Sequence, residues 1–190
     1  MRIASHSPHP GLLIFCALTL ATGGCSDRSA TRGTDLLPAQ LHGLQLVESR
    51  SGTEATAEIA RLHKQPVAPR ASEVGTYEAE GIRAELYVSA FNTPDEASEE
   101  FEAMVSGINQ GVEGYGHHTH FDVAGHDVHV VFGNSRINYF YASDNKLTWL
   151  AVRQPALARA ALAELLGVAL DSIPRLPGMP RQQPQDSEPS

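Results

Sequence analysis

Alternating apolar and polar residues predict most of the strands in this chain. Between residues 82 and 90 every even-numbered position is apolar, and the odd-numbered positions are Arg, Glu, Tyr and Ser. A two-residue period of this kind is typical of a strand with one buried face. Comparable runs predict further strands at residues 44–48, 75–79, 119–123, 127–132, 137–142 and 147–152. Turn-forming dipeptides lie between several of these runs: Glu80-Gly81, Ala124-Gly125, Gly133-Asn134 and Asp144-Asn145.

A longer period predicts three helices. The second is the best marked, because Thr93 supplies an N-cap, Pro94 the first helical position and Glu96 a capping-box carboxylate. Its apolar face comprises Ala97, Phe101, Met104, Val105 and Ile108. The first helix is expected to begin at Ser51 and the third to run from Pro155 to a C-terminal Gly167. The first helix would bury Ala55, Ile59 and Leu62, and the third Leu157, Ala161, Leu162 and Leu165.

The expected order is β-α-β-β-α-β-β-β-β-α, which indicates an α+β fold. We expect a largely antiparallel sheet with three helices packed on one face. Residues 87–94 and 150–155 both lead from a strand into a proline-initiated helix. This repetition suggests two related β-β-α halves.

The N-terminal segment predicts export. Arg2 is its only charged residue, an apolar run follows at residues 11–21, and the small residues at 22–24 precede Cys25. Charged start, apolar middle and small-residue exit make up a secretory signal peptide, and the run is shorter than the ~20 residues of a membrane span. We therefore expect residues 1–24 to be a signal peptide.

Small residues followed directly by cysteine resemble the lipobox of bacterial lipoproteins. The resemblance implies cleavage after residue 24, a diacylglyceryl group on Cys25 and N-acylation of the same residue. The sequence departs from the family pattern at Thr22, where the family favours leucine. Ser26 in place of Asp implies, by resemblance to enterobacterial sorting, an outer-membrane location over the inner membrane. The alternative is an ordinary signal peptide that releases an unanchored protein.

Composition sets the remaining boundaries. The chain has 14 basic and 22 acidic residues; loss of the signal peptide removes only Arg2 and leaves a net charge of −9. Such a charge disfavours nucleic acid as a partner. We expect a lipidated Cys25 and flexible tether at residues 25–37, a single α+β domain at 38–173 and a disordered proline-rich tail at 174–190. This mature domain resembles small uncharacterised α+β lipoprotein domains.

Five histidines lie between residues 117 and 129. If Ala124-Gly125 is a two-residue hairpin turn, His120 faces His129 and Asp122 faces Asp127. One side of the hairpin then carries His118, His120, Asp122, Asp127 and His129. Imidazole and carboxylate ligands suit Zn²⁺ or Cu²⁺, so these residues form a candidate metal site. The simpler interpretation is a solvated hairpin face without a cofactor, and a pH-responsive histidine patch is a third.

Four aromatic residues of neighbouring strands form a second candidate site. Tyr87, Tyr139, Tyr141 and Trp149 could line a binding groove for a peptide or glycan, although aromatic residues in strands more often serve as packing.

Catalytic signatures are missing from the sequence. It has no Gly-x-Ser-x-Gly elbow, no His-Glu-x-x-His motif, no P-loop and no dinucleotide-binding glycine fingerprint. We therefore expect no catalytic residues. We expect a lipid-anchored periplasmic protein whose domain binds or scaffolds an envelope protein. The alternative is a divalent-metal-binding envelope protein that uses the histidine- and aspartate-rich hairpin.

Overall fold

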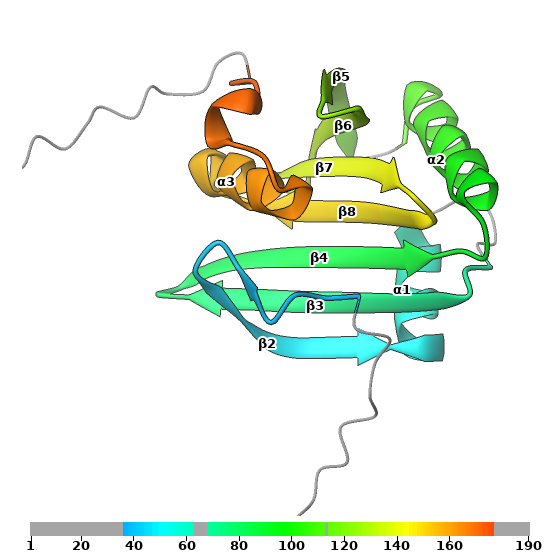
Figure 1. The fold of residues 1–190 in the computed structure, drawn as a ribbon, viewed down its shortest axis with the longest axis horizontal. Helices are drawn as coiled ribbons and strands as arrows, with labels where there is room; N and C mark the ends of the chain where they lie inside the picture. The colour runs from blue at the N-terminus through cyan, green and yellow to red at the C-terminus, as the bar shows by residue number, and fades with distance from the viewer. Residues whose placement is uncertain (1–35, 63–67, 113, 177–190) are drawn as a thin grey trace, which may run out of the picture. The chain divides into compact units, whose positions relative to one another are not determined.

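A computed structural model describes residues 36–62, 68–112 and 114–176. In these ranges eight strands form one antiparallel sheet in the order β1-β2-β3-β4-β8-β7-β6-β5. The strands are β1 (Gln40–Leu41), β2 (Leu44–Ser51), β3 (Ala71–Ala79), β4 (Ile82–Ala90), β5 (Tyr115–Val123), β6 (His126–Gly133), β7 (Arg136–Ser143) and β8 (Lys146–Val152). The helices are α1 (Gly52–Leu62), α2 (Pro94–Asn109), α3 (Pro155–Leu166) and the short 3₁₀ turn η1 (Leu170–Ser172). The sheet curls, and Figure 1 shows β5 and β6 turned away from the direction of β7 and β8.

The predicted α+β class and the antiparallel sheet are confirmed. All seven predicted strands and all three helices occur in the expected order. Only the two-residue strand β1 was not predicted, because two residues carry no readable period.

The helices cover both faces of the sheet, so the expectation that all three pack on one face is wrong. Helix α1 packs through Ala55 and Ile59 against Val74 of β3. Helix α2 packs on the same face, where Phe101 contacts Phe140 and Trp149 belongs to the same cluster. Helix α3 and η1 cover the opposite face; Figure 1 shows α3 in front of β7 and β8, and α1 behind β2 and β3.

The reason lies in the central strands, which are buried on both sides. In β8 Leu150 and Val152 join the core under α3, whereas Trp149 and Ala151 join the core under α2. A strand with two buried faces needs cover on both. Because β4 and β8 are antiparallel neighbours, a two-fold axis relating them would keep α2 and α3 on one face. The suggested relation between two halves therefore does not extend to these helices.

A single row of side chains crosses six strands on the α1–α2 face. Register pairs place Val74 beside Tyr87, Tyr87 beside Trp149, and Trp149 beside Phe140. The row continues from Phe140 to His129 and ends at His120 on the outermost strand β5. An apolar row in the middle of the sheet thus becomes a row of imidazoles at its edge.

The predicted helix ends are confirmed for α2 and α3. Thr93 Oγ1 accepts a hydrogen bond from the Glu96 amide at 3.2 Å, and Glu96 accepts one from the Asn92 amide at 2.9 Å. The Thr93 bond is that of a capping box, whereas Glu96 reaches one residue beyond the N-cap, to Asn92. Gly167 ends α3 in the left-handed conformation at φ 64°, which favours glycine.

The domain extends slightly beyond its predicted limits. Leu36 and Leu37 pack against the main core, and Leu176 is buried within it. The folded domain therefore includes Leu36, Leu37 and Leu176. Among the described residues, no helix is long and apolar enough to span a bilayer.

Candidate metal site

The β5–β6 hairpin has the predicted register. His120 pairs with His129, Phe121 with Val128 and Asp122 with Asp127. The turn residues Ala124 and Gly125 both have positive φ, at 51° and 81°. Two consecutive positive φ angles are typical of a two-residue type I′ turn, which matches the twist of a hairpin.

Strand β5 carries a β-bulge next to the predicted site residue His118. The register shifts between Gly116 and Thr119, and His117 adopts φ 54°. The two adjacent histidines lie on opposite faces: the His117 ring contacts Phe132 on the α3 side, whereas the His118 ring contacts His129 on the α2 side.

Hydrogen bonds connect five side chains in a continuous chain. Starting at α2, Asn109 Oδ1 lies 2.7 Å from His118 Nδ1. The other nitrogen of that ring, Nε2, lies 2.7 Å from His129 Nδ1. His129 Nε2 is 3.1 Å from Asp127 Oδ2, and His120 Nδ1 is 2.9 Å from Asp127 Oδ1.

The side chains connected by these hydrogen bonds differ sharply in their exposure to solvent. His129 is 5% exposed and is enclosed by two aromatic rings, an edge-on contact with Phe101 at 5.1 Å and a tilted one with Phe140 at 5.2 Å. The side chains of His120 and Asp127 are 62% and 45% exposed. One ligand candidate is therefore rigidly packed, and two are open to solvent.

The surroundings shift the pKa of two members. Burial acts to raise the pKa of Asp127, but hydrogen bonds from His120 and His129 outweigh it and hold that pKa below its usual value. Burial lowers the pKa of His118, and the charges of His129 and His120 lower it further against the opposing effect of Asp127. Asp127 is thus an anion and His118 a neutral ring near pH 7.

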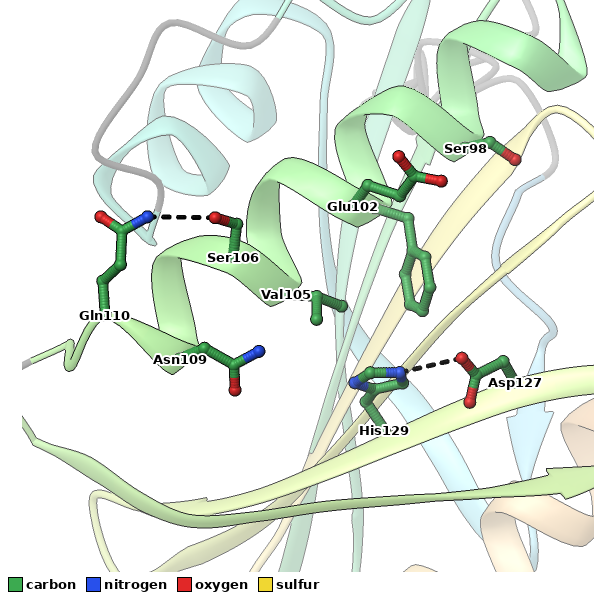
Figure 2. A pocket seen from close by; sticks show the side chains of 9 residues that line it. Ser98, Glu102, Val105, Ser106, Asn109, Gln110, Asp127 and His129 are labelled. Atoms are coloured by element: carbon green, nitrogen blue, oxygen red, sulfur yellow. Dashed lines mark hydrogen bonds and ion pairs between the residues drawn. The ribbon is translucent and has the colours of Figure 1, made fainter.

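A cleft of about 630 Å³ lies above His129, between α2 and β6. Its α2 wall carries mainly polar residues: Ser98, Glu102, Ser106, Asn109 and Gln110, together with Phe101 and Val105. Figure 2 shows Asn109 on the last turn of α2 and His129 on β6 across the cleft, with Asp127 beside His129.

Three of the predicted metal ligands come together. His120, Asp127 and His129 each offer one ligand atom, and these atoms lie within 4.8 Å of one another. His118 is outside this group, and its two ring nitrogens face Asn109 and His129. Asp122 lies on the same face opposite Asp127 and is exposed, but it is also outside the group.

The predicted aromatic groove is wrong as a single surface. Tyr87 and Trp149 are register partners on the α1–α2 face. Tyr139 and Tyr141 lie on the opposite face, buried in the core under α3. Strand alternation separates the two pairs, because the tyrosines at 139 and 141 flank Phe140 and point away from it.

The predicted lipidation site, Cys25, lies outside the described residues, and so do the signal peptide and most of the tether and tail. Sequence reasoning missed Asn109 and Phe101 as parts of the histidine site. Both lie on α2, and nothing in the pattern of that helix shows which strand it covers.

Comparisons of the chain with protein-family models, curated proteins and solved structures found no match. What the domain does is therefore inferred from the geometry of the site.

Proposed function

We propose that this protein binds a divalent transition-metal ion through His120, Asp127 and His129. The observation that carries the proposal is the convergence of two imidazoles on one carboxylate, with all three candidate ligand atoms within 4.8 Å. The hairpin register sets His120 opposite His129, and the Asp127 carboxylate receives one hydrogen bond from each ring.

The spacing is close to what a small metal ion needs. Zinc binds nitrogen and oxygen ligands at about 2.0–2.1 Å, so neighbouring ligand atoms of a tetrahedral site lie about 3.3 Å apart. The Asp127 oxygens lie 2.9 Å from His120 Nδ1 and 3.1 Å from His129 Nε2. An ion in place of the shared protons requires these contacts to lengthen by a few tenths of an ångström and the two imidazole nitrogens, within 4.8 Å of each other, to approach the same spacing.

The ligand types favour particular metals. Two imidazoles and one carboxylate suit Zn²⁺, Cu²⁺ or Ni²⁺, whereas Ca²⁺ and Mg²⁺ prefer sites made of oxygen atoms. Three protein ligands leave a fourth position of a tetrahedral ion open to another group. His129 and Asp127 line the cleft under α2, so that position is accessible to a small polar molecule.

Isothermal titration of the full chain, purified in detergent, with Zn²⁺ and separately with Cu²⁺ tests the proposal. We expect one ion per chain with a dissociation constant below about 10 μM, and a loss of at least tenfold in His120→Ala. The exposed His120 is the better choice for substitution, because removal of the buried His129 also removes packing. Asp122→Asn is the matched control on the same face. No saturable binding, or equal binding by His120→Ala, would refute the site.

We further propose that the chain is exported and anchored through a lipid on Cys25, with the outer membrane as its location. The support is the charged start, apolar run and small-residue exit before this cysteine. Metabolic labelling with a fatty acid is expected to mark the wild type and the control Cys16→Ser, and to fail in Cys25→Ser. Labelling that persists in Cys25→Ser would refute the anchor.

A scaffolding role toward an envelope protein stays a prediction. The metal site is the stronger proposal for the domain, because it rests on a defined set of contacts among named side chains.

A further inference from the structure

We infer that His118 and Asn109 are positioning residues for the metal ligand His129, connected to it by a hydrogen-bond chain that can run in either direction. The inference rests on the proposed metal site and assigns a role to two residues that are not ligands. Asn109 is the last residue of α2, so the chain also connects the metal site to this helix.

The geometry leaves little choice of partners. His118 uses Nδ1 toward Asn109 Oδ1 and Nε2 toward His129 Nδ1, both at 2.7 Å. His129 turns its other nitrogen, Nε2, toward Asp127 and the proposed metal, so the nitrogen that His118 contacts is not the metal-binding one. His118 is therefore placed to hydrogen-bond with a ligand and not to act as one.

Without metal, each hydrogen bond in this series is donated in the direction of Asp127. A neutral imidazole carries one N–H donor and one acceptor nitrogen. His129 donates from Nε2 to Asp127, so its Nδ1 accepts the Nε2–H of His118. The Nδ1 of His118 is then an acceptor, and the amide of Asn109 must turn its NH₂ group toward it.

With metal on His129 Nε2, the hydrogen bonds are donated in the opposite direction, away from the metal and toward Asn109. The proton of His129 moves to Nδ1 and is donated to His118 Nε2, and the proton of His118 moves to Nδ1 and is donated to Asn109 Oδ1. Each ring keeps one proton, so the two rings release none. The 2.7 Å contact between His118 Nδ1 and Asn109 Oδ1 fits this second direction, and a half-turn of the Asn109 amide fits the first.

An asparagine is well suited to the end of such a chain. Its amide presents a donor on one side and an acceptor on the other, and a half-turn exchanges them. A carboxylate can only accept hydrogen bonds, and an aliphatic side chain can neither donate nor accept them. Partners that orient a metal-bound histidine in this way typically contribute 10–100-fold to metal affinity.

Three variants of the full chain separate the roles by competitive zinc titration. Asn109→Leu is expected to weaken zinc binding 10–100-fold. Asn109→Asp, which supplies the acceptor required in the bound state, is expected to bind within threefold of the wild type or more tightly. Gln110→Leu is the control: Gln110 lines the same cleft but hydrogen-bonds Ser106.

Long-range ¹H–¹⁵N correlation of the imidazoles supplies a readout that a merely structural role would not move. In the wild type, zinc is expected to shift the His118 proton from Nε2 to Nδ1. With ¹¹³Cd in place of zinc, metal–nitrogen coupling is expected at His120 and His129 and not at His118.

The outcomes distinguish the two proposals. Absence of zinc binding by the wild type would overturn the proposed function. Zinc binding by the wild type with equal affinity in Asn109→Leu, an unchanged His118 tautomer, or ¹¹³Cd coupling to His118 would overturn the positioning role alone. If Asn109→Leu fails to fold, the tautomer shift in the wild type and the affinity of Asn109→Asp still decide the matter.

Discussion

His120 and His129 lie directly opposite each other on β5 and β6, with ring centroids 4.9 Å apart. Between them they combine two properties of a metal site. His129 is fixed by aromatic packing, whereas the His120 side chain is 62% exposed and free to adjust to an ion. The rigid ligand fixes where the ion binds, and the solvent-exposed ligand lets the ion enter the site.

Zinc is expected to stabilise the fold. A ligand at 100 times its dissociation constant adds about 2.7 kcal/mol to the free energy of unfolding, which corresponds to roughly 5–10 °C in Tm for a domain of this size. Differential scanning calorimetry of the wild type with and without Zn²⁺ measures the shift. His120→Ala, with at least tenfold weaker binding, should show about half of it or less, and Mg²⁺ at the same concentration should have no effect. An equal shift in His120→Ala would contradict the assignment.

Glu85 is expected to stabilise the sheet through a half-buried ion-pair network. Its carboxylate accepts hydrogen bonds from Arg136, from the Tyr87 hydroxyl at 3.0 Å and from Arg83 at 3.2 Å. Glu85→Gln should lower the free energy of unfolding by about 2 kcal/mol at pH 7, because it leaves Arg136 without its counter-charge. Urea denaturation measures the change. Glu78→Gln is the control, since its pair with Arg83 is exposed and worth under about 0.5 kcal/mol.

The contribution of Glu85 is also expected to depend on pH in a defined direction. Burial acts to raise its pKa, but the hydrogen bonds and charges of Arg136, Tyr87 and Arg83 together outweigh burial, so the pKa of the folded state lies below the ordinary 4.5. A depressed pKa stabilises the fold fully above 4.5, and this stabilisation is lost as pH falls through the folded-state value. The difference between wild type and Glu85→Gln should be constant from pH 6 to 8 and shrink below pH 4.5. A difference that grows at low pH would contradict this assignment.

Two buried tyrosines should respond in opposite ways to loss of the hydroxyl group. Tyr77 donates to the Pro38 carbonyl at 2.9 Å, whereas the Tyr139 hydroxyl has no hydrogen-bond partner among the described residues. Tyr77→Phe should destabilise the fold by about 1 kcal/mol, and Tyr139→Phe should be neutral or stabilise it by up to about 1 kcal/mol. Chemical denaturation followed by circular dichroism compares them. A larger loss in Tyr139→Phe than in Tyr77→Phe would be inconsistent with these contacts.

The N-caps of α2 and α3 provide another matched pair. Thr93 caps α2 with its side chain, whereas Gln154 makes no capping hydrogen bond at the start of α3. Thr93→Ala should cost about 1 kcal/mol of stability, and Gln154→Ala less than about 0.5 kcal/mol. Thermal unfolding of the two variants tests the difference. Equal losses would show that the Thr93 hydroxyl contributes nothing beyond packing.

The hairpin could be predicted from sequence because two local signals agreed. Val128 and Val130 mark the buried face of β6, and the Ala124-Gly125 turn sets the register, so His120 and His129 had to be opposite each other. The bulge at His117 could not be predicted in this way. It depends on one non-glycine residue in the left-handed region, which leaves no periodic signal.

The arrangement of the helices was harder to predict. Residues 147–152 are almost continuously apolar and every one of them is buried, a pattern that fits a strand covered on both faces. The expectation of helices on one face overlooked this signal. The contact of Asn109 with His118 is different in kind, since it depends on how the chain returns from α2 to β5, which no pattern of polar and apolar residues describes.

The row of rings across the sheet places an intrinsic fluorophore near the proposed metal site. Its single tryptophan, Trp149, stacks on Phe140 at 5.1 Å, and Phe140 contacts His129 at 5.2 Å. Emission from one known position, two strands from the imidazoles, can therefore report the arrival of a quenching ion such as Cu²⁺ without any attached dye.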